Sequence, residues 1–208
     1  MIEIENILDV RKYVGGLKAI IFDLDDTLYS EKEYVRCGYK EIGKLFPSIP
    51  DTEEILWDLF EERKPAIDIF LQQKGIYNEE MKRKCLNIYR KQKPYIHLYK
   101  GVCEMLLMFK SNGYMLGMIT DGRPEGQSAK IDALGLAFSF DQIIITDELG
   151  GNVYRKPCDK AFRLMAEALN VDFSQMCYVG DNIRKDFVAP DKLGMRCIWF
   201  HNSDGIYM

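Results

Sequence analysis

The sequence has no CxxC pair, only two histidines, and no apolar run near the roughly 18–20 residues that a membrane span needs. Its six cysteines are scattered, which indicates neither a zinc site nor a disulfide framework, so we expect reduced thiols that fill core space. Residues 1–14 carry acids where a secretory signal has basic residues. These absences favour a cytoplasmic protein that does not insert into a membrane.

The chain also lacks an excess of positive charge. Its 208 residues carry a formal net charge of -4, which provides no basic field for a nucleic-acid backbone, so we do not expect nucleic acid as a partner. A hydrophobic content of 47% and a charged content of 29% are ordinary for a folded globular protein. The length suits one well-buried domain with a smaller appendage, whereas the oligomeric state has no signature in the sequence.

Short apolar segments alternate with helical patterns over much of the chain. We expect strands at 19–23, 114–119, 141–146, 176–179 and 195–200. Apolar strands that alternate with helices are typical of βαβ units, in which helices cover both faces of a parallel sheet. The sequence therefore predicts an α/β fold with a Rossmann-like parallel sheet.

The pattern changes between residues 29 and 97, where no convincing strand is found. Helical periodicity in this region is interrupted by prolines and a glycine. We therefore predict an all-helical domain, residues 29–97, inserted after the first strand of a core formed by residues 1–28 and 98–208.

Two helix starts and one further short helix can be placed from local signals. Asp51 and Thr52, followed by Glu54, form a candidate capping box, and Asn78 precedes the helical stretch EEMKRKCLNIYRKQK. Residues 1–14 have the spacing of a short amphipathic helix that ends at a pair of glycines.

Polar side chains gather where the predicted strands end, which is where ligands bind in open parallel sheets. These residues are Asp23, Asp25, Thr120, Asp121, Gly122, Lys156, Asp181 and Asp186. Carboxylates from separate strands repel each other unless a cation lies between them, and oxygen ligands without histidine or thiolate suit Mg²⁺. The Thr120 hydroxyl and the Lys156 ammonium are groups that bind a tetrahedral dianion. The pattern predicts a phosphate site with magnesium.

Four motifs in this order resemble those of the haloacid dehalogenase-like superfamily. They are DLDDT at 23–27, Thr120 at a strand end, Lys156 followed by Pro157, and GDNIRKD at 180–186. The helical insert resembles the subfamily I cap of that superfamily. The resemblance covers the chain apart from about its first fifteen residues, and it implies the same fold.

The resemblance also implies roles for the two aspartates of the first motif. Asp23 would attack phosphorus and form an aspartyl phosphate, and Asp25 would protonate the leaving oxygen and later activate water. Dehalogenases of this family lack the second carboxylate because a halide leaves without a proton, so Asp25 favours phosphoryl transfer. Asp26 would point away from the site, and we interpret it as a turn or capping residue.

The remaining motifs imply groups that bind phosphate and metal. Thr120 and the amides of Asp121 and Gly122 would hold the phosphoryl group, which Lys156 would neutralise. Asp181 would bind Mg²⁺ together with Asp23 and the backbone carbonyl of Asp25. Asp186 would support the site by orienting Lys156 or a metal-bound water. Arg123 follows the phosphate loop directly and is a further candidate for substrate contact.

The function that these patterns predict is a magnesium-dependent phosphatase, a phosphoric monoester hydrolase. Its substrate would be a small phosphorylated metabolite such as a sugar phosphate or a nucleoside monophosphate. Two alternatives remain open at this point. One is a phosphomutase that uses the same aspartates, and the other is a non-catalytic phosphate-binding protein on the same fold.

Overall fold

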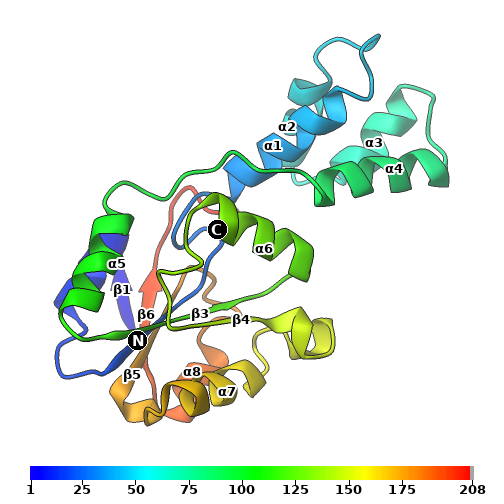
Figure 1. Cartoon of the computed structure of the whole chain (residues 1–208). Coiled ribbons are helices and arrows are strands. Elements are labelled where there is room, and N and C mark those ends of the chain that lie inside the picture. Colours follow the sequence, from blue (N-terminus) through cyan, green and yellow to red (C-terminus); the bar gives the residue numbers. More distant parts are fainter. Residues whose placement is uncertain (207–208) are drawn as a thin grey trace. The chain divides into compact units, whose positions relative to one another are not determined.

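The computed structural model describes residues 1–206 and divides into two units (Figure 1). The core unit comprises Met1–Glu31 and Ile96–Met208, and the helical unit comprises Lys32–Tyr95. The helical unit is therefore a continuous segment that interrupts the core unit in sequence.

A parallel sheet organises the core unit. Within residues 1–206 it has six strands in the order β1-β6-β5-β2-β3-β4, and every neighbouring pair is parallel. The strands are β1 (Ile2–Ile4), β2 (Ala19–Phe22), β3 (Met115–Thr120), β4 (Gln142–Ile145), β5 (Met176–Gly180) and β6 (Arg196–Phe200). The predicted α/β fold with a Rossmann-like parallel sheet is confirmed.

Helices pack against this sheet. They are α5 (Val102–Ser111), α6 (Pro124–Ala133), α7 (Lys160–Leu169) and α8 (Val188–Leu193), with 3-10 helices η1 (Ile7–Lys12), η2 (Thr146–Leu149), η3 (Asn152–Tyr154) and η4 (Phe173–Gln175). Along β2, Ile21 belongs to the same buried cluster as Phe162 of α7, whereas the next residue, Phe22, contacts Phe109 of α5 at 6.4 Å between ring centroids. Successive side chains thus point to opposite, buried faces, which explains why the β2 sequence is apolar throughout.

The start of the chain corrects one sequence expectation. Residues Ile2–Ile4 form the edge strand β1 beside β6, with Ile2 opposite Ile198, and only Ile7–Lys12 is helical, as a 3-10 turn. The expected helix over residues 1–14 is therefore wrong in its first part. A three-residue strand obtains its hydrogen bonds from a strand almost 200 residues away, so local periodicity could not reveal it.

The helical unit contains most of α1 (Glu31–Gly43) and all of α2 (Thr52–Glu61), α3 (Ala66–Gln73) and α4 (Glu79–Arg90). It has its own apolar core, in which Ile42, Leu56, Phe70 and Leu71 are fully buried. An edge-to-face contact between Phe46 and Phe70, at 5.3 Å between centroids, belongs to that core.

The two helix starts expected inside this unit both lie where they were predicted, at Thr52 and after Asn78, but their caps differ. Asn78 is the N-cap of α4, as predicted, and its side-chain oxygen accepts a hydrogen bond of 2.8 Å from the Met81 amide. The capping box at α2 is wrong, because Asp51 adopts a left-handed conformation and makes no side-chain cap bond. The Thr52 hydroxyl donates instead to the Ile49 carbonyl oxygen at 2.9 Å.

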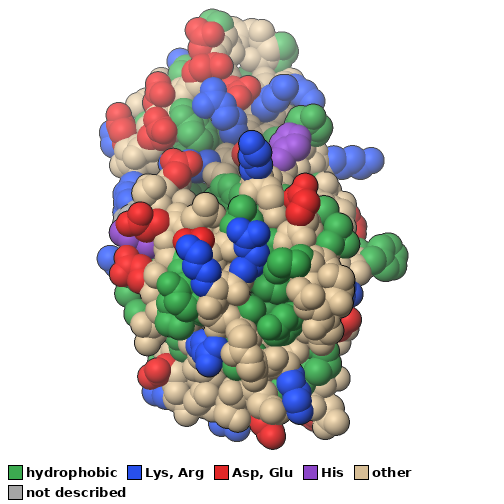
Figure 2. Space-filling view, turned by 90° about the vertical axis from the view of Figure 1, so that its left-hand side faces the viewer, with side chains coloured by type: hydrophobic (Ala, Val, Ile, Leu, Met, Phe, Trp, Pro, Cys, Tyr) green, Lys and Arg blue, Asp and Glu red, His purple; other side chains and the backbone are tan. Residues whose placement is uncertain are grey.

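Surface features and thiols complete the description. Acidic and basic side chains are interspersed on the face that Figure 2 shows. All six cysteines are free; Cys85, Cys177 and Cys197 are buried, but Cys103 is exposed and fills no core space. None of the helices within residues 1–206 has the length and apolar character needed to cross a bilayer.

Candidate active site

The candidate site lies at the carboxyl ends of the central strands. Strand β2 lies between β3 and β5, so the chain leaves β2 in one direction and later returns on its other side. Ligands bind at such a switch point in open parallel sheets. Asp23 directly follows β2, Thr120 ends β3, and Asp181 directly follows β5. The Asp23 amide also donates to the Val179 carbonyl oxygen at 2.8 Å, which fixes the backbone at Asp23 against β5.

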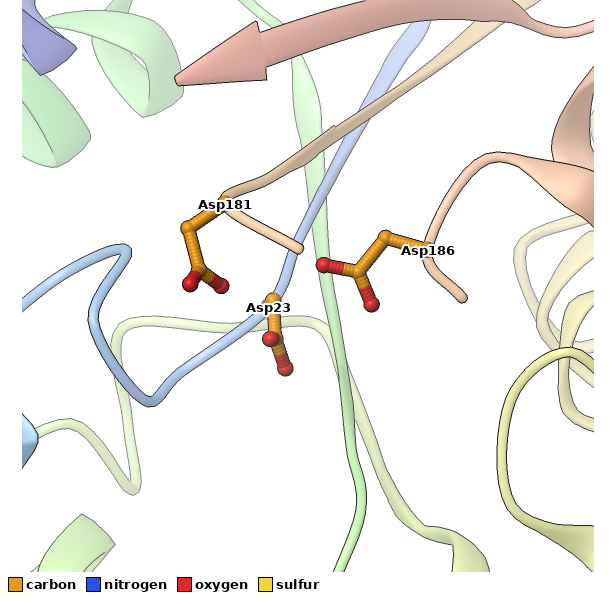
Figure 3. A group of neighbouring side chains, drawn as sticks. All are labelled: Asp23, Asp181 and Asp186. Carbon is orange, nitrogen blue, oxygen red and sulfur yellow. The ribbon is translucent and has the colours of Figure 1, made fainter. Parts of the chain in front are cut away.

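Three carboxylates converge at this edge (Figure 3). One oxygen from each of Asp23, Asp181 and Asp186 lies within 4.8 Å of the other two. Asp186 comes from the loop after Asp181, and its Oδ2 accepts a 3.0 Å hydrogen bond from the Asn182 amide. A Cβ atom on Gly180 would lie only 2.5 Å from Asp186 Oδ2, so the absence of a side chain at Gly180 permits this close approach.

Lys156 links two of these carboxylates. Its Nζ lies 2.8 Å from Asp23 Oδ1, 2.8 Å from Asp186 Oδ1 and 2.7 Å from the Tyr178 hydroxyl. Burial alone would lower the pKa of Lys156, but Asp186 and Asp23 together raise it well above its ordinary value. Lys156 is therefore a fixed positive charge at the foot of the site.

The three carboxylates together carry more negative charge than Lys156 alone can neutralise. Burial raises the pKa of Asp23 to about 6. Lys156 offsets part of this rise, and the negative charge of Asp186 adds to it. Burial together with Asp23 and Asp186 raises the pKa of Asp181 to about 9. The protein alone thus leaves Asp181 without adequate compensation, and a hard divalent cation would supply it through oxygen ligands. Asp23, Asp181 and the carbonyl of Asp25 fit such an ion by the chemistry of their donor atoms.

Asp121 joins the loop after β3 to the lysine segment. Its Oδ1 accepts from the Thr146 hydroxyl at 2.9 Å and from the Lys156 amide at 3.1 Å, and its Oδ2 accepts from Lys185 Nζ at 3.0 Å. Burial alone would raise the pKa of Asp121, but Lys156 and Lys185 hold it below its ordinary value. The Asp121 side chain therefore braces the loop, and the predicted contact with a phosphoryl group would fall to its backbone amide.

A second hydrogen-bond network surrounds Asp25. Its Oδ1 accepts from the Tyr29 hydroxyl at 2.5 Å and from Lys130 Nζ at 2.7 Å, and its Oδ2 accepts from Gln127 Nε2 at 2.9 Å. Burial alone would raise the pKa of Asp25, but Lys130, with Tyr29 and Gln127, holds it below its ordinary value. Asp25 is thus held by three donors, none of which belongs to the four sequence motifs.

Gln127 also contacts the end of β3 and the loop that follows it. Its Nε2 donates to Thr120 Oγ1 at 2.5 Å, so that oxygen acts as an acceptor and the single hydroxyl proton of Thr120 is left to donate elsewhere. Gly122 has a φ of +143°, and a Cβ there would lie 3.1 Å from the Gln127 side chain. The loop conformation therefore depends on glycine at position 122.

Asp26 has the structural role that the sequence suggested. It adopts a left-handed φ of 52°, and its carboxylate accepts hydrogen bonds from the Glu31 amide at 2.8 Å and the Ile206 amide at 2.7 Å. Asn202 Nδ2 donates to the Asp26 carbonyl oxygen at 2.8 Å. These bonds join the first motif to the start of α1 and to the last described residues of the chain.

A cavity of about 280 Å³ opens at this edge of the core unit. It is lined by Asp23, Asp25, Glu31, Asp121, Arg155, Lys156, Asp181, Asn182 and Lys185. Among the remaining sequence-predicted residues, Thr120 and Asp186 are fully buried and do not line the cavity. Arg123 is exposed at the N-cap of α6 and does not line the cavity, and neither does Gly122.

Glu31, Arg155, Asn182 and Lys185 line the cavity although none of them was among the predicted site residues. Arg155 makes two bonds to Asp147, of 2.7 and 2.6 Å, and Lys185 pairs with Asp121. Two signals were available in the sequence, because Arg155 directly precedes Lys156, and Asn182 and Lys185 lie inside the motif at 180–186.

Comparison with known proteins identifies the class of this fold and site. The family model described as haloacid dehalogenase-like hydrolase matches residues 20–200, which is most of the chain. The chain belongs to the haloacid dehalogenase-like hydrolase family. The family predicted from the four motifs is thereby confirmed.

Two named relatives are phosphatases. The chain is 30% identical over 196 residues to glyceraldehyde 3-phosphate phosphatase from Pyrococcus abyssi, with 88% of this chain and 81% of the relative covered. It is 25% identical over 225 residues to phosphoserine phosphatase from Thermus thermophilus, with 88% of each chain covered.

Solved structures agree on the fold. The hydrolase YfnB from Bacillus subtilis, in a crystal structure bound to magnesium, is similar with a TM-score of 0.67 at 19% identity, and 88% of this chain and 86% of that chain are covered. A phosphatase of the same family from Thermococcus onnurineus gives a TM-score of 0.56 at 23% identity, with 88% and 86% covered.

Proposed function

We propose that this chain is a magnesium-dependent phosphatase that hydrolyses a small phosphorylated metabolite through an aspartyl phosphate on Asp23. The observation that carries the proposal is the convergence of Asp23, Lys156 and Asp181 at one sheet edge. It supports a nucleophile, a fixed positive charge and a metal ligand around one cavity. That the chain is a phosphoric monoester hydrolase follows from its family and its named phosphatase relatives.

The first half-reaction transfers the phosphoryl group to the protein. A carboxylate oxygen of Asp23 attacks phosphorus and the bond from phosphorus to the ester oxygen breaks. Asp25, which must carry a proton in the complex with the ester, gives that proton to the departing oxygen and becomes a carboxylate. Lys156 offsets the repulsion between the Asp23 carboxylate and the phosphate dianion, which it can do because its Nζ lies 2.8 Å from Asp23. Thr120 and the amides of Asp121 and Gly122 hold the phosphoryl oxygens.

The second half-reaction restores the enzyme. Asp25, now a carboxylate, takes a proton from water, the water oxygen attacks phosphorus, and the bond to Asp23 breaks. Lys130, Gln127 and Tyr29 donate hydrogen bonds to the Asp25 carboxylate, the form that this step requires.

The metal belongs to the proposal as a group held by this chain's own residues. Asp23, Asp181 and the carbonyl of Asp25 would hold Mg²⁺, and Asp186 would orient Lys156. When bound, the ion supplies positive charge that screens the phosphoryl group from the carboxylates.

A small substrate suits the cavity. Its volume of about 280 Å³ is at the low end for ligand pockets, which supports a phosphate ester with few carbon atoms. Glyceraldehyde 3-phosphate and phosphoserine, the compounds in the names of the relatives, are of that size. The helical unit, Lys32–Tyr95, is the candidate cap domain of this enzyme.

A phosphate-release assay with a panel of metabolite phosphates tests the proposal. We expect Mg²⁺-dependent release of inorganic phosphate by the wild type and none by Asp23→Asn, which should remain folded by circular dichroism. Isomerisation of a sugar phosphate without phosphate release would indicate a phosphomutase. Magnesium or phosphate binding with no turnover would indicate a binding protein, and activity retained by Asp23→Asn would exclude Asp23 as the nucleophile.

A further inference from the structure

The helix that follows the phosphate loop carries two polar side chains in buried positions. Gln127 and Lys130 of α6 are each only 4% exposed, and their spacing of three residues places them on one face of the helix. Buried lysines are rare unless they are paired, because removing a charge from water costs free energy. The four motifs and the proposed phosphoryl-transfer steps use neither residue as a reacting group.

Both residues are directed at the same carboxyl group. Lys130 Nζ lies 2.7 Å from Asp25 Oδ1, and Gln127 Nε2 lies 2.9 Å from Asp25 Oδ2, so each oxygen of Asp25 has its own donor on α6. Lys130 also lies 3.7 Å from Glu31, the first residue of α1. The carboxyl group is thereby fixed in position and in rotation about its own axis.

We propose that Lys130 and Gln127 are positioning residues that hold Asp25 where its carboxyl group can exchange a proton with the ester oxygen. The inference rests on the proposed function, in which Asp25 is the acid and base. A general acid works only within hydrogen-bond reach of the atom that it protonates, so a carboxyl group that rotates freely loses rate without losing substrate binding. Gln127 also donates to Thr120 Oγ1 at 2.5 Å. It thus fixes the position of the Asp25 carboxyl group relative to the Thr120 hydroxyl, the proposed phosphoryl ligand.

A leaving-group test separates this role from a purely structural one. The alkyl phosphates phosphoserine and glyceraldehyde 3-phosphate need a proton on the departing oxygen, whereas the phenolate of p-nitrophenyl phosphate departs without one. We expect Lys130→Met to lower kcat/KM for the alkyl phosphates about 10–100-fold, a range typical for loss of a supporting contact. For p-nitrophenyl phosphate the loss should stay below about 3-fold, because kcat/KM reports only the steps up to the aspartyl phosphate.

Three further variants sharpen the result. Asp25→Asn should show the same leaving-group dependence with a larger loss, and Lys130→Arg, which keeps the charge, should recover most of the alkyl phosphate activity. Lys110→Met is the control, because it removes a lysine of α5 that lies 3.3 Å from Asp141. It should leave kcat/KM unchanged for both kinds of substrate. Equal losses on both kinds of substrate, or no loss on either, in folded Lys130→Met would overturn the inference.

A fourth variant covers the case in which Lys130→Met does not fold. Gln127→Met should then lower kcat/KM for both kinds of substrate, because Gln127 also contacts Thr120, with the larger loss for the alkyl phosphates. A loss of equal size for both would overturn the role of α6. If the proposed function itself is wrong, the wild type will release no phosphate from any substrate. That result distinguishes failure of the proposed function from failure of this inference.

Discussion

At the scale of single residues, the chemistry of the site depends on two lysines that are each 4% exposed. Lys156 pairs with Asp23 and Asp186, and Lys130 pairs with Asp25 and Glu31. The two lysines therefore divide the acids into two groups, one around Asp23, the proposed nucleophile, and one around Asp25, the proposed acid and base. Burying charges costs free energy that their pairing offsets only in part, so the site is held by the surrounding fold more than by its ion pairs.

Glu31 gives a pH-dependent prediction at this scale. Burial and Asp25, opposed by Lys130, raise the pKa of Glu31 from 4.5 to about 8. The folded protein thus keeps a proton that the unfolded chain releases, so Glu31 makes the free energy of unfolding fall as pH rises from about 4.5 to 8. Glu31→Gln removes this contribution. We expect the variant to gain about 1–3 kcal/mol relative to the wild type between pH 5 and pH 8.

Urea unfolding in the presence of a metal chelator, repeated across this pH range, measures that difference. Glu33→Gln is a suitable control, because Glu33 lies in the same helix and does not line the cavity. Parallel pH curves for the wild type and Glu31→Gln would refute the assignment of a raised pKa to Glu31.

Single residues also show how far the sequence could be read. Asp23, Lys156 and Asp181 could be placed in one site because each follows a strand or a motif whose position in a parallel sheet is regular. Lys130 and Gln127 could not, because their contacts depend on how closely α6 packs against the strand ends. Arg123 is the opposite case, because the sequence suggested a substrate contact that the structure does not place in the cavity. Its position directly after Gly122 was not enough to bring it there.

At the scale of elements, the loop between β3 and α6 joins the two networks. It follows Thr120, the last residue of β3, carries Asp121 and Gly122, and leads into α6, whose Lys130 contacts Asp25. The three-residue strand β1 is an element that periodicity could not predict, whereas the longer strands of the sheet could be predicted to within a few residues. The reason is physical, because short edge elements depend on distant partners and long periodic ones on their own sequence.

The loop supplies the second prediction. Gly122→Ala introduces a Cβ at a φ of +143°, 3.1 Å from the Gln127 side chain. We expect a loss of about 1–3 kcal/mol in the free energy of unfolding and a fall in kcat/KM for phosphate esters of both kinds, because the loop amides and Gln127 move together.

Gly135→Ala is the matched control for this change. Gly135 also has a positive φ, +67°, but a Cβ there would meet no atom within 4 Å. It should lose stability alone, with kcat/KM unchanged. Chemical denaturation and steady-state kinetics on both variants decide the matter, and unchanged kinetics in Gly122→Ala would remove the loop from the site.

At the scale of the whole molecule, the core unit contains every residue that lines the cavity. The excess of buried negative charge at the sheet edge therefore lowers the stability of the core unit. A bound divalent cation would relieve this repulsion in the folded state alone, and a ligand that binds only the folded state stabilises it.

Magnesium should accordingly raise the thermal unfolding midpoint. At about 100 times its dissociation constant, a bound ion adds about 2.7 kcal/mol, which corresponds to about 5–10 °C for a chain of this size. Asp181→Asn should lose most of this increase, while Asp172→Asn, an exposed aspartate next to η4, should keep it. Differential scanning fluorimetry with Mg²⁺, compared with Na⁺ at equal ionic strength, makes the measurement, and equal shifts in all three proteins would contradict a site at Asp181.

The most direct test of the central claim is acid-quench mass spectrometry of Asp25→Asn during turnover of p-nitrophenyl phosphate. This substrate needs no acid for its leaving group, but the variant lacks the base for water attack, so the covalent intermediate should accumulate. The account predicts a burst of one equivalent of p-nitrophenolate and a phosphoryl group on the peptide that contains Asp23. A burst with the phosphoryl group on another side chain, or steady release with the Asp23 peptide unmodified, would contradict it.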